Sequence, residues 1–250
     1  MVASLLAVET LWRRELIRFW RQKSRVLAVV ASPLIFWAVM GFGSGADGPR
    51  RFFPGTVVLT VMFSAIFSTM SIIEDRREGF LLSMLVSPAS RTSLVLGKIL
   101  GSATLAWIQG MIVLAFAPLA GIPLSLGQLA PLACIVFLVS FTLTALGFLI
   151  AWKFDSTQGY HAVMNLLLLP MWLLSGAVFS MAGASGPIRA VMLINPLTYS
   201  TALLTALLTG TDADGSPAVG ASFAVTVAFG IVLLGASAAL ANQKTSSISA

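Results

Sequence analysis

Two neighbouring residues have types that bind phosphate in other proteins. Gly97-Lys98 looks like the end of a phosphate-binding loop. Such a loop needs a glycine five residues before Gly97 and a serine or threonine directly after the lysine. Thr92 and Ile99 occupy those two positions. The segment therefore does not form a nucleotide site.

A second short segment has the residues of a nucleophilic site. Residues 183–186 resemble the Gly-x-Ser-Gly motif of rhomboid-type intramembrane serine proteases, which also need a histidine base within hydrogen-bond reach. The single histidine, His161, is expected near the inner face of the membrane, whereas Ser185 is expected near the outer face. The two side chains are then separated by about one bilayer thickness, so they cannot act as a pair.

Ionisable groups at membrane depth are what an intramembrane enzyme or a proton-coupled carrier requires. None of the nine acidic residues falls in the middle of a predicted span. Lys98 lies near the inner end of a span, where its flexible stem can carry the ammonium group to the interface. Gln109 and Asn165 are the strongest polar groups within the spans. The commoner role of such groups is to form hydrogen bonds between helices, and the alternative is to contact a substrate.

The composition indicates an integral membrane protein. Of 250 residues, 58% are hydrophobic and 10% are charged, and the mean hydropathy is +0.95. Soluble domains carry about 25% charged residues, so this chain cannot cover a globular surface with polar groups. The single cysteine, Cys134, excludes an internal disulfide and a metal site made of cysteines.

Six apolar stretches have the length of a membrane span: 26–42, 54–73, 94–119, 129–152, 162–179 and 219–241. Each can cross a hydrocarbon core about 30 Å thick as an α-helix. A seventh apolar stretch, 187–210, is interrupted by Asn195 and Pro196. We interpret it as short helices in a re-entrant or interfacial hairpin rather than as a seventh span. The expected fold is an all-α polytopic membrane protein with this hairpin before the last span.

Basic residues decide the orientation of these spans. The net charge is +6, and six of the fifteen basic residues precede the first span: Arg13, Arg14, Arg18, Arg21, Lys23 and Arg25. With six spans, the side that holds both termini also holds most of the other basic residues, so the positive-inside rule places both termini in the cytoplasm. We expect a multi-pass protein of the cell (inner) membrane whose basic charge faces anionic lipids and not nucleic acid.

Residues 1–25 are expected to form a cytoplasmic amphipathic helix. At 100° per residue the large apolar side chains, including Trp12 and Trp20, fall within an arc of about 120°. The arginines opposite this arc include Arg14, Arg18 and Arg21. We expect the aromatic side in lipid and the arginines toward phosphates or cytosol. The sequence leaves open whether this interfacial helix is a plain anchor or takes part in transport.

The loop between the second and third spans has a distinctive order of residues. Its charged cluster, Glu74-Asp75-Arg76-Arg77-Glu78, ends at Gly79 and is followed by an apolar stretch, by Pro88 and Arg91, and then by Gly97-Lys98. Before the last span comes a second group, formed by Asn195, Pro196 and Tyr199. Taken alone, the charged cluster is also typical of solvated charges at a membrane boundary.

In order and spacing these features resemble the ABC-2 type permeases, the membrane subunits of ATP-driven exporters such as those of the daunorubicin-resistance and Nod-factor kind. The resemblance runs from the N-terminal helix to the last span and so covers essentially the whole chain, with 26–250 as a six-span transmembrane domain. It implies that residues 74–93 form a cytoplasmic loop that couples to a separate ATPase. The coupling residues would be Glu74, Asp75, Arg76, Arg77, Glu78, Gly79, Pro88 and Arg91. It also implies an outer gate at 187–210 that includes Asn195, Pro196 and Tyr199.

The resemblance further implies a function and partners. The chain would move a hydrophobic or amphiphilic molecule, such as a drug, lipid or glycolipid, outward, and would not itself be an enzyme. ATP and Mg²⁺ would bind to two copies of the ATPase, with no cofactor in this chain. Six spans are too few to enclose the path of an amphiphile, so a second permease subunit is expected, as a homodimer or heterodimer. The alternative is a non-transporting membrane scaffold or assembly protein, which would copurify with no ATPase.

Overall fold

The computed structural model describes residues 2–85, 90–212 and 214–243, and every regular element in these ranges is helical. The expected all-α membrane architecture is confirmed. Six helical segments are long and apolar enough to cross a membrane: Val26–Gly43, Gly48–Arg77, Arg91–Leu114, Leu126–Ala151, Thr157–Ala177 and Val219–Asn242. Four of the six begin three to six residues before the predicted start, because helices continue past the apolar core into the interface.

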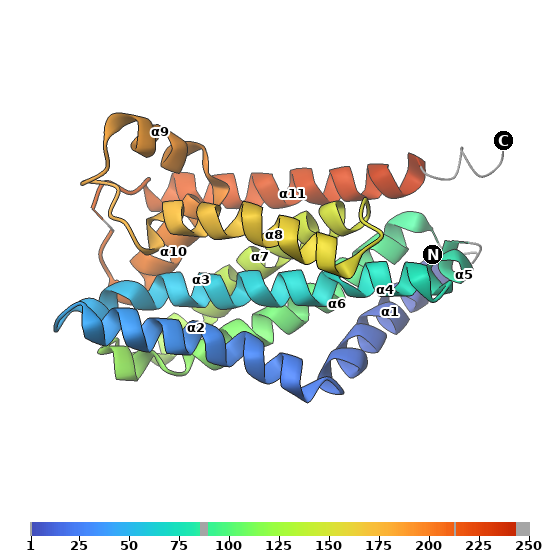
Figure 1. Cartoon of the computed structure of the whole chain (residues 1–250), viewed down its shortest axis with the longest axis horizontal. Helices are drawn as coiled ribbons and strands as arrows, with labels where there is room; N and C mark the ends of the chain where they lie inside the picture. Colours follow the sequence, from blue (N-terminus) through green and yellow to red (C-terminus); the bar gives the residue numbers. More distant parts are fainter. Residues whose placement is uncertain (1, 86–89, 213, 244–250) are drawn as a thin grey trace.

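The N-terminal amphipathic helix is a separate element from the first span. Helix α1 is Val2–Trp20, and helix α2 is Lys23–Gly43. The chain turns between them, so α1 crosses the end of the bundle at an angle to α2 (Figure 1). The amphipathic helix therefore ends before residue 25, the end predicted from its periodicity.

The second span lies at the centre of the bundle. Helices α3 (Gly48–Thr69) and α4 (Ser71–Arg77) form it together, and 83% of its apolar window is buried, against 22% for the first span and 22% for the last. It begins at Gly48 rather than at residue 54 because Pro49 stands in the first helical turn, where a missing N–H costs no helical hydrogen bond. The first, third, fourth and fifth spans pack against this helix.

Helices α6 (Arg91–Leu114) and α7 (Leu126–Ala151) pack against α3. Helix α6 ends at Leu114, earlier than the predicted end at 119, and a short 3₁₀ turn, η1 (Ala117–Ala120), follows. Pro118 lies within this turn, and a proline lacks the N–H that a continuing helix needs. The predicted third span was therefore too long at this end.

The fifth span and the segment after it are irregular. Helix α8 (Thr157–Trp172) runs into a single π-helical turn, η2 (Leu173–Ala177). Helices α9 (Gly186–Ile194) and α10 (Pro196–Thr209) then meet at an angle of 85°, and α11 (Val219–Gln243) is the last span. The bent helix pair before the last span is as predicted.

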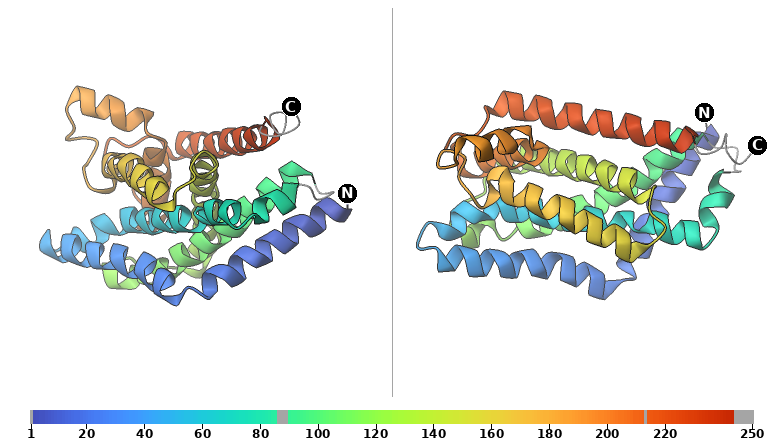
Figure 2. Two further views of the ribbon diagram at one scale, coloured as in Figure 1. Left: turned by 45° about the vertical axis from the view of Figure 1, so that its right-hand side comes forward. Right: turned by 45° about the horizontal axis from the view of Figure 1, so that its top comes forward.

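The bundle has two distinct ends. The start of α1, the short helix α5 (Phe80–Leu85) and the end of α11 lie at one of them, which we call the terminal end (Figure 1). The α2–α3 turn, α9 and α10 lie at the other, which we call the hairpin end. Both views in Figure 2 show the same division. The predicted coupling loop and the predicted gate are thus separated by the length of the spans.

Candidate functional site

Three charged side chains meet inside the terminal end of the bundle: Glu15 of α1, Asp75 of α4 and Lys98 of α6. They are 2%, 0% and 4% exposed, respectively. The Lys98 Nζ lies 2.5 Å from the Glu15 Oε1 and also pairs with the Asp75 carboxylate. Because a buried charge is costly unless it is paired, this buried triad fixes three helices relative to one another.

Two arginines of α1 surround the buried triad. Arg14 donates to both carboxylate oxygens of Asp75, at 3.0 and 2.8 Å, the bidentate geometry that strengthens such a pair. Arg18 donates to Asp75 at 2.8 Å and to Glu74 at 2.7 Å, and its Nη2 lies 3.5 Å from an oxygen of Glu78. Asp75 is therefore the common acceptor of two arginines and a lysine.

The charge of Arg14 is stabilised by these acids. Burial by itself acts to lower the pKa of its guanidinium, since desolvation disfavours the charged form. The hydrogen bond and charge of Asp75, with the charges of Glu15 and Glu78, outweigh burial and raise the pKa above its ordinary value. Arg14 therefore stays cationic at physiological pH.

This arrangement corrects two expectations. Arg14 and Arg18 point at the acids of α4 instead of at lipid phosphates or cytosol. Lys98 does not extend to the interface, because Glu15 and Asp75 hold its ammonium group inside the bundle. Of the other predicted residues of α1, Trp12 is partly exposed and its indole N–H donates to Thr104 of α6 at 3.0 Å. Arg21 is exposed, and the side chain of Trp20 lies outside the described residues.

The cause of both corrections is the close packing of α1 on α6. A Cβ on Gly97 would lie 3.0 Å from the Cβ of Leu11, and a Cβ on Gly101 would lie 2.8 Å from the Cβ of Glu15. The two glycines therefore leave a groove in α6 that accepts the α1 backbone, as small residues do at helix interfaces in membranes. One turn of α6 contains both this groove and Lys98, so Glu15 is brought directly to the ammonium group.

The short helix α5 follows Gly79 and lies next to the cluster. Gly79 has φ +74°, a left-handed conformation that glycine adopts without steric cost, and α5 begins at the next residue. The Arg14 guanidinium lies 3.8 Å from the centroid of the Phe80 ring, a cation–π contact. The Glu78 side chain is 60% exposed. The turn and α5 therefore present a surface while one end of α5 rests on the cluster.

The other predicted coupling residues bind within the chain. Arg76 donates to the carbonyl oxygens of Trp152 at 2.5 Å and Phe154 at 2.9 Å and to the carboxylate of Asp155 at 2.8 Å. Arg77 donates to the carbonyl oxygen of Asp155 at 2.9 Å. These two arginines hold the turn between α7 and α8 against α4.

The remaining loop residues have different positions. The guanidinium of Arg91, at the start of α6, donates to the carbonyl oxygen of Asn242 near the end of α11 at 3.2 Å. Pro88 lies outside the described residues. Among the described coupling residues, Arg77, Glu78 and Gly79 are therefore the ones that the structure leaves exposed.

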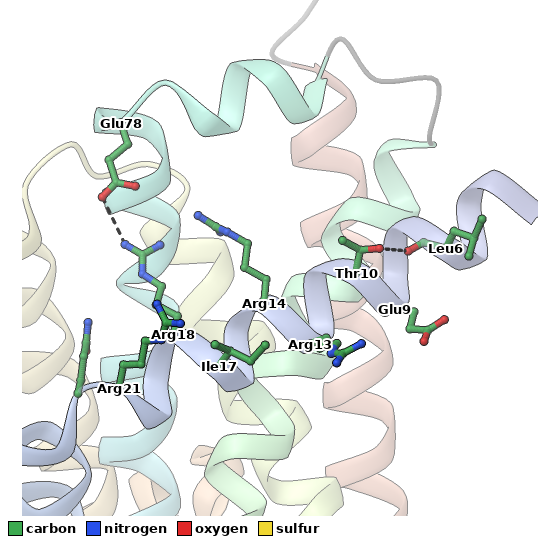
Figure 3. A pocket seen from close by; sticks show the side chains of 10 residues that line it. Leu6, Glu9, Thr10, Arg13, Arg14, Ile17, Arg18, Arg21 and Glu78 are labelled. Carbon is green, nitrogen blue, oxygen red and sulfur yellow. Dashed lines mark hydrogen bonds and ion pairs between the residues drawn. The ribbon is translucent and has the colours of Figure 1, made fainter.

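An open groove of about 770 Å³ runs along α1 beside the cluster. Figure 3 shows the Arg18 side chain reaching Glu78 across it, with Arg13 further along α1. Arg13 and Arg21 line the groove and form no ion pair with any residue that the structure describes. The groove therefore presents two arginines, together with Glu9, next to α5.

At the hairpin end, the predicted gate residues form the bend between α9 and α10. The Asn195 side chain caps α10 and donates to the carbonyl oxygen of Met171 at 2.5 Å. Pro196 is the first residue of α10, the position where proline suits a helix. The Tyr199 hydroxyl donates to the carbonyl oxygen of Leu193 at 2.8 Å. These contacts hold the bent pair in its shape.

Most of the sequence matches a known family. A family model described as ABC-2 type transporter matches residues 7–209, from α1 to the end of α10. The chain belongs to the ABC-2 type transporter family. It is therefore a multi-pass membrane subunit of a transporter and not itself a catalyst, and the family implies an ABC ATPase as its partner. Within the described ranges, no group of three or more metal-binding side chains could hold a metal ion.

Curated relatives of this ABC-2 permease have names that describe them as transport permeases (ycf38). The protein of Porphyra purpurea is 25% identical over 241 residues, which cover 91% of this chain and 81% of the relative. The protein of Cyanophora paradoxa is 25% identical over 206 residues, covering 75% of this chain and 69% of the relative. That of Pyropia yezoensis is 23% identical over 206 residues, covering 77% and 70%.

Proposed function

We propose that this ABC-2 permease is the transmembrane subunit of an ATP-driven exporter that moves a hydrophobic or amphiphilic molecule outward. Two copies of a separate ATPase would bind ATP and Mg²⁺ and dock at the terminal end, with both termini of the permease in the cytoplasm of the cell (inner) membrane. The observation that carries the proposal is the exposed Glu78–Gly79 turn with α5 behind it, resting on a buried charge cluster. A surface of this kind can receive a partner and transmit its movement.

The cluster offers a path for that movement. A shift of α5 moves the Phe80 ring against the Arg14 guanidinium, which lies 3.8 Å away. Arg14 is bound to Asp75, and Asp75 to Lys98 of α6. Since these charges stay paired at low cost only if their helices move together, α1, α4 and α6 would respond as one unit. This gives the interfacial helix a role beyond anchoring.

Lipids and a second permease subunit complete the proposed assembly. The exposed Arg13 and Arg21 would face lipid phosphates at the inner surface. Three hollows between the helices have volumes of only about 20 Å³ or 10 Å³, far below the ~300–1,000 Å³ of ligand sites. An amphiphile would therefore pass along a surface between two permease subunits.

Glu78→Lys tests the docking surface. We expect the variant to reach the membrane at the normal level, because Glu78 is exposed, and to retain about tenfold less ATPase on copurification, since a reversed charge at an interface costs binding. The matched control is Asp212→Lys, which makes the same charge change at an exposed acid of the hairpin end. It should copurify the ATPase normally.

Two results would contradict the proposal. If Glu78→Lys and the parent protein recover equal amounts of ATPase, the Glu78–Gly79 turn is not part of the docking surface. If the unmodified permease copurifies with no ATPase at all, the alternative of a membrane scaffold would replace the exporter.

Cysteine labelling tests the proposed orientation. In a Cys134→Ser background, single cysteines at Ser185 and Ser216 should react with an impermeant thiol reagent added outside intact cells, because both lie at the hairpin end. A cysteine at Ser247, beyond the described residues, should be protected. Protection at Ser216 together with reaction at Ser247 would show that α9 and α10 cross the membrane as a seventh span.

A further inference from the structure

A polar cavity lies at the hairpin end, where neither ATPase docking nor the charge cluster involves it. It has a volume of about 590 Å³, is open to the outside, and is lined by the first turn of α3, the π-helical turn η2, helix α10 and residues 211, 212, 214 and 216. Its size lies within the ~300–1,000 Å³ of ligand sites. We call it the hydroxyl cavity, because serine and threonine side chains make up much of its wall.

A stripe of threonines on α10 forms one side of the hydroxyl cavity. Its members are Thr198, Thr201, Thr205 and Thr209. Their spacings of three and four residues place them on a single helix face. In a helix that packs within a membrane bundle, such a continuous polar face indicates a surface that meets water or a polar ligand.

Each threonine hydroxyl of this stripe already donates its proton to another group of the protein. Thr205 donates to the carbonyl oxygen of Thr201 at 2.9 Å, and Thr209 to that of Thr205 at 2.8 Å. Thr201 donates to the Ser175 Oγ at 3.1 Å, and Thr198 to a backbone carbonyl at 2.6 Å. A hydroxyl has one proton and two lone pairs, so the stripe offers the cavity mainly hydrogen-bond acceptors. Such a wall favours a ligand that carries many donors.

Charged side chains of both signs line the cavity. The acids are Asp47, Asp212 and Asp214, and the bases are Arg50 and Arg51. Across the described residues, none of these acids forms an ion pair with either arginine. The Arg50 guanidinium donates to the carbonyl oxygen of Thr209 at 3.2 Å. Carboxylates and guanidinium groups therefore both remain able to bind a ligand.

These features discriminate among head groups. Three acids against two arginines, together with the acceptor wall, disfavour a phosphate. The residues that line the cavity include no aromatic ring, so the cavity lacks the cage that binds a quaternary ammonium group. A head group with several hydroxyls can bind to all three kinds of side chain in the lining. Each hydroxyl donates to a threonine or aspartate oxygen and accepts from an arginine.

We propose that the hydroxyl cavity binds a polyhydroxylated, carbohydrate-like head group of an amphiphile. Resting on the proposed export function, this makes the cavity the place where the head group of the substrate is received as it leaves the membrane.

The test is a cysteine at Thr205 in a Cys134→Ser background, with the permease in phosphatidylcholine nanodiscs that leave both ends accessible. Digalactosyl diacylglycerol is the probe. It should slow the reaction of this cysteine with a maleimide about threefold, as expected when about two thirds of the sites are occupied. The same fraction of phosphatidylglycerol or of a cationic lipid should leave the rate unchanged. A cysteine at Ser185, outside the cavity at the same end, should be insensitive to all three lipids.

A second measurement uses the chain without a reporter cysteine. Native mass spectrometry should detect retained galactolipid on the parent permease, and Thr209→Val, which removes one acceptor at similar volume, should reduce that retention severalfold. Equal maleimide rates with and without galactolipid, or slowing by the charged lipids instead, would overturn the proposal. Because no ATPase is present, failure here leaves the exporter proposal standing, and failure of ATPase copurification leaves this result unaffected.

Discussion

Lys98→Met is expected to lower the melting temperature of the purified permease by roughly 10 °C. Removing one partner of a buried ion pair costs about 3–5 kcal/mol, and 1 kcal/mol shifts the midpoint by about 2–4 °C in chains of this size. Methionine keeps the apolar stem of the lysine, so the loss reports the charge. Glu15 is most affected, because its other cation, Arg14, is 3.7 Å away. Tryptophan fluorescence during heating in detergent measures the change.

Two further variants make this result specific. Lys153→Met removes an exposed lysine of the same end and should shift the midpoint by about 2 °C or less, as surface substitutions do. Adding Glu15→Gln to Lys98→Met should recover part of the loss, because one buried negative charge is removed together with its cation. An unchanged midpoint for Lys98→Met would show that the buried triad does not hold the helices together.

Gly101→Leu is expected to release α1 from α6. Even the Cβ of the new side chain would lie 2.8 Å from the Cβ of Glu15 and 3.3 Å from the Cα of Trp12, so the helix backbone has to move. Overpacking costs about 1–3 kcal/mol or more, and each 1.4 kcal/mol is a factor of ten in an equilibrium. Trypsin should therefore cleave at Arg14 and Arg18 at least about ten times faster, because the opened helix exposes both sites.

The matched control for this glycine is Gly235→Leu. A Cβ at Gly235, within α11, would meet no atom within 4 Å, so trypsin cleavage of α1 should remain at the parental rate. If Gly101→Leu also leaves cleavage unchanged, α1 does not depend on the α6 groove. Loss of copurified ATPase with Gly101→Leu, but not with Gly235→Leu, would further connect the position of α1 to docking.

Several features of this protein were determined by its sequence alone. The hydrocarbon core of a membrane requires about 20 apolar residues in each spanning helix and excludes an unpaired backbone, so six spans could be located from composition and length. The interruption by Asn195 and Pro196 predicted the bent pair before the last span for a local reason, since both residues favour the start of a new helix.

The partners of the charged residues were decided only by the tertiary structure. Helical periodicity places Arg14 and Arg18 on one side of α1 but does not state which helix faces that side. Glu15 and Lys98 are 83 positions apart in the chain, and no local pattern joins them. A signal existed, because Glu15 lies midway between Leu11 and Phe19 on one helix stripe. Its meaning depends on the groove at Gly97 and Gly101, which brings α1 close enough to α6 for the buried charges to pair.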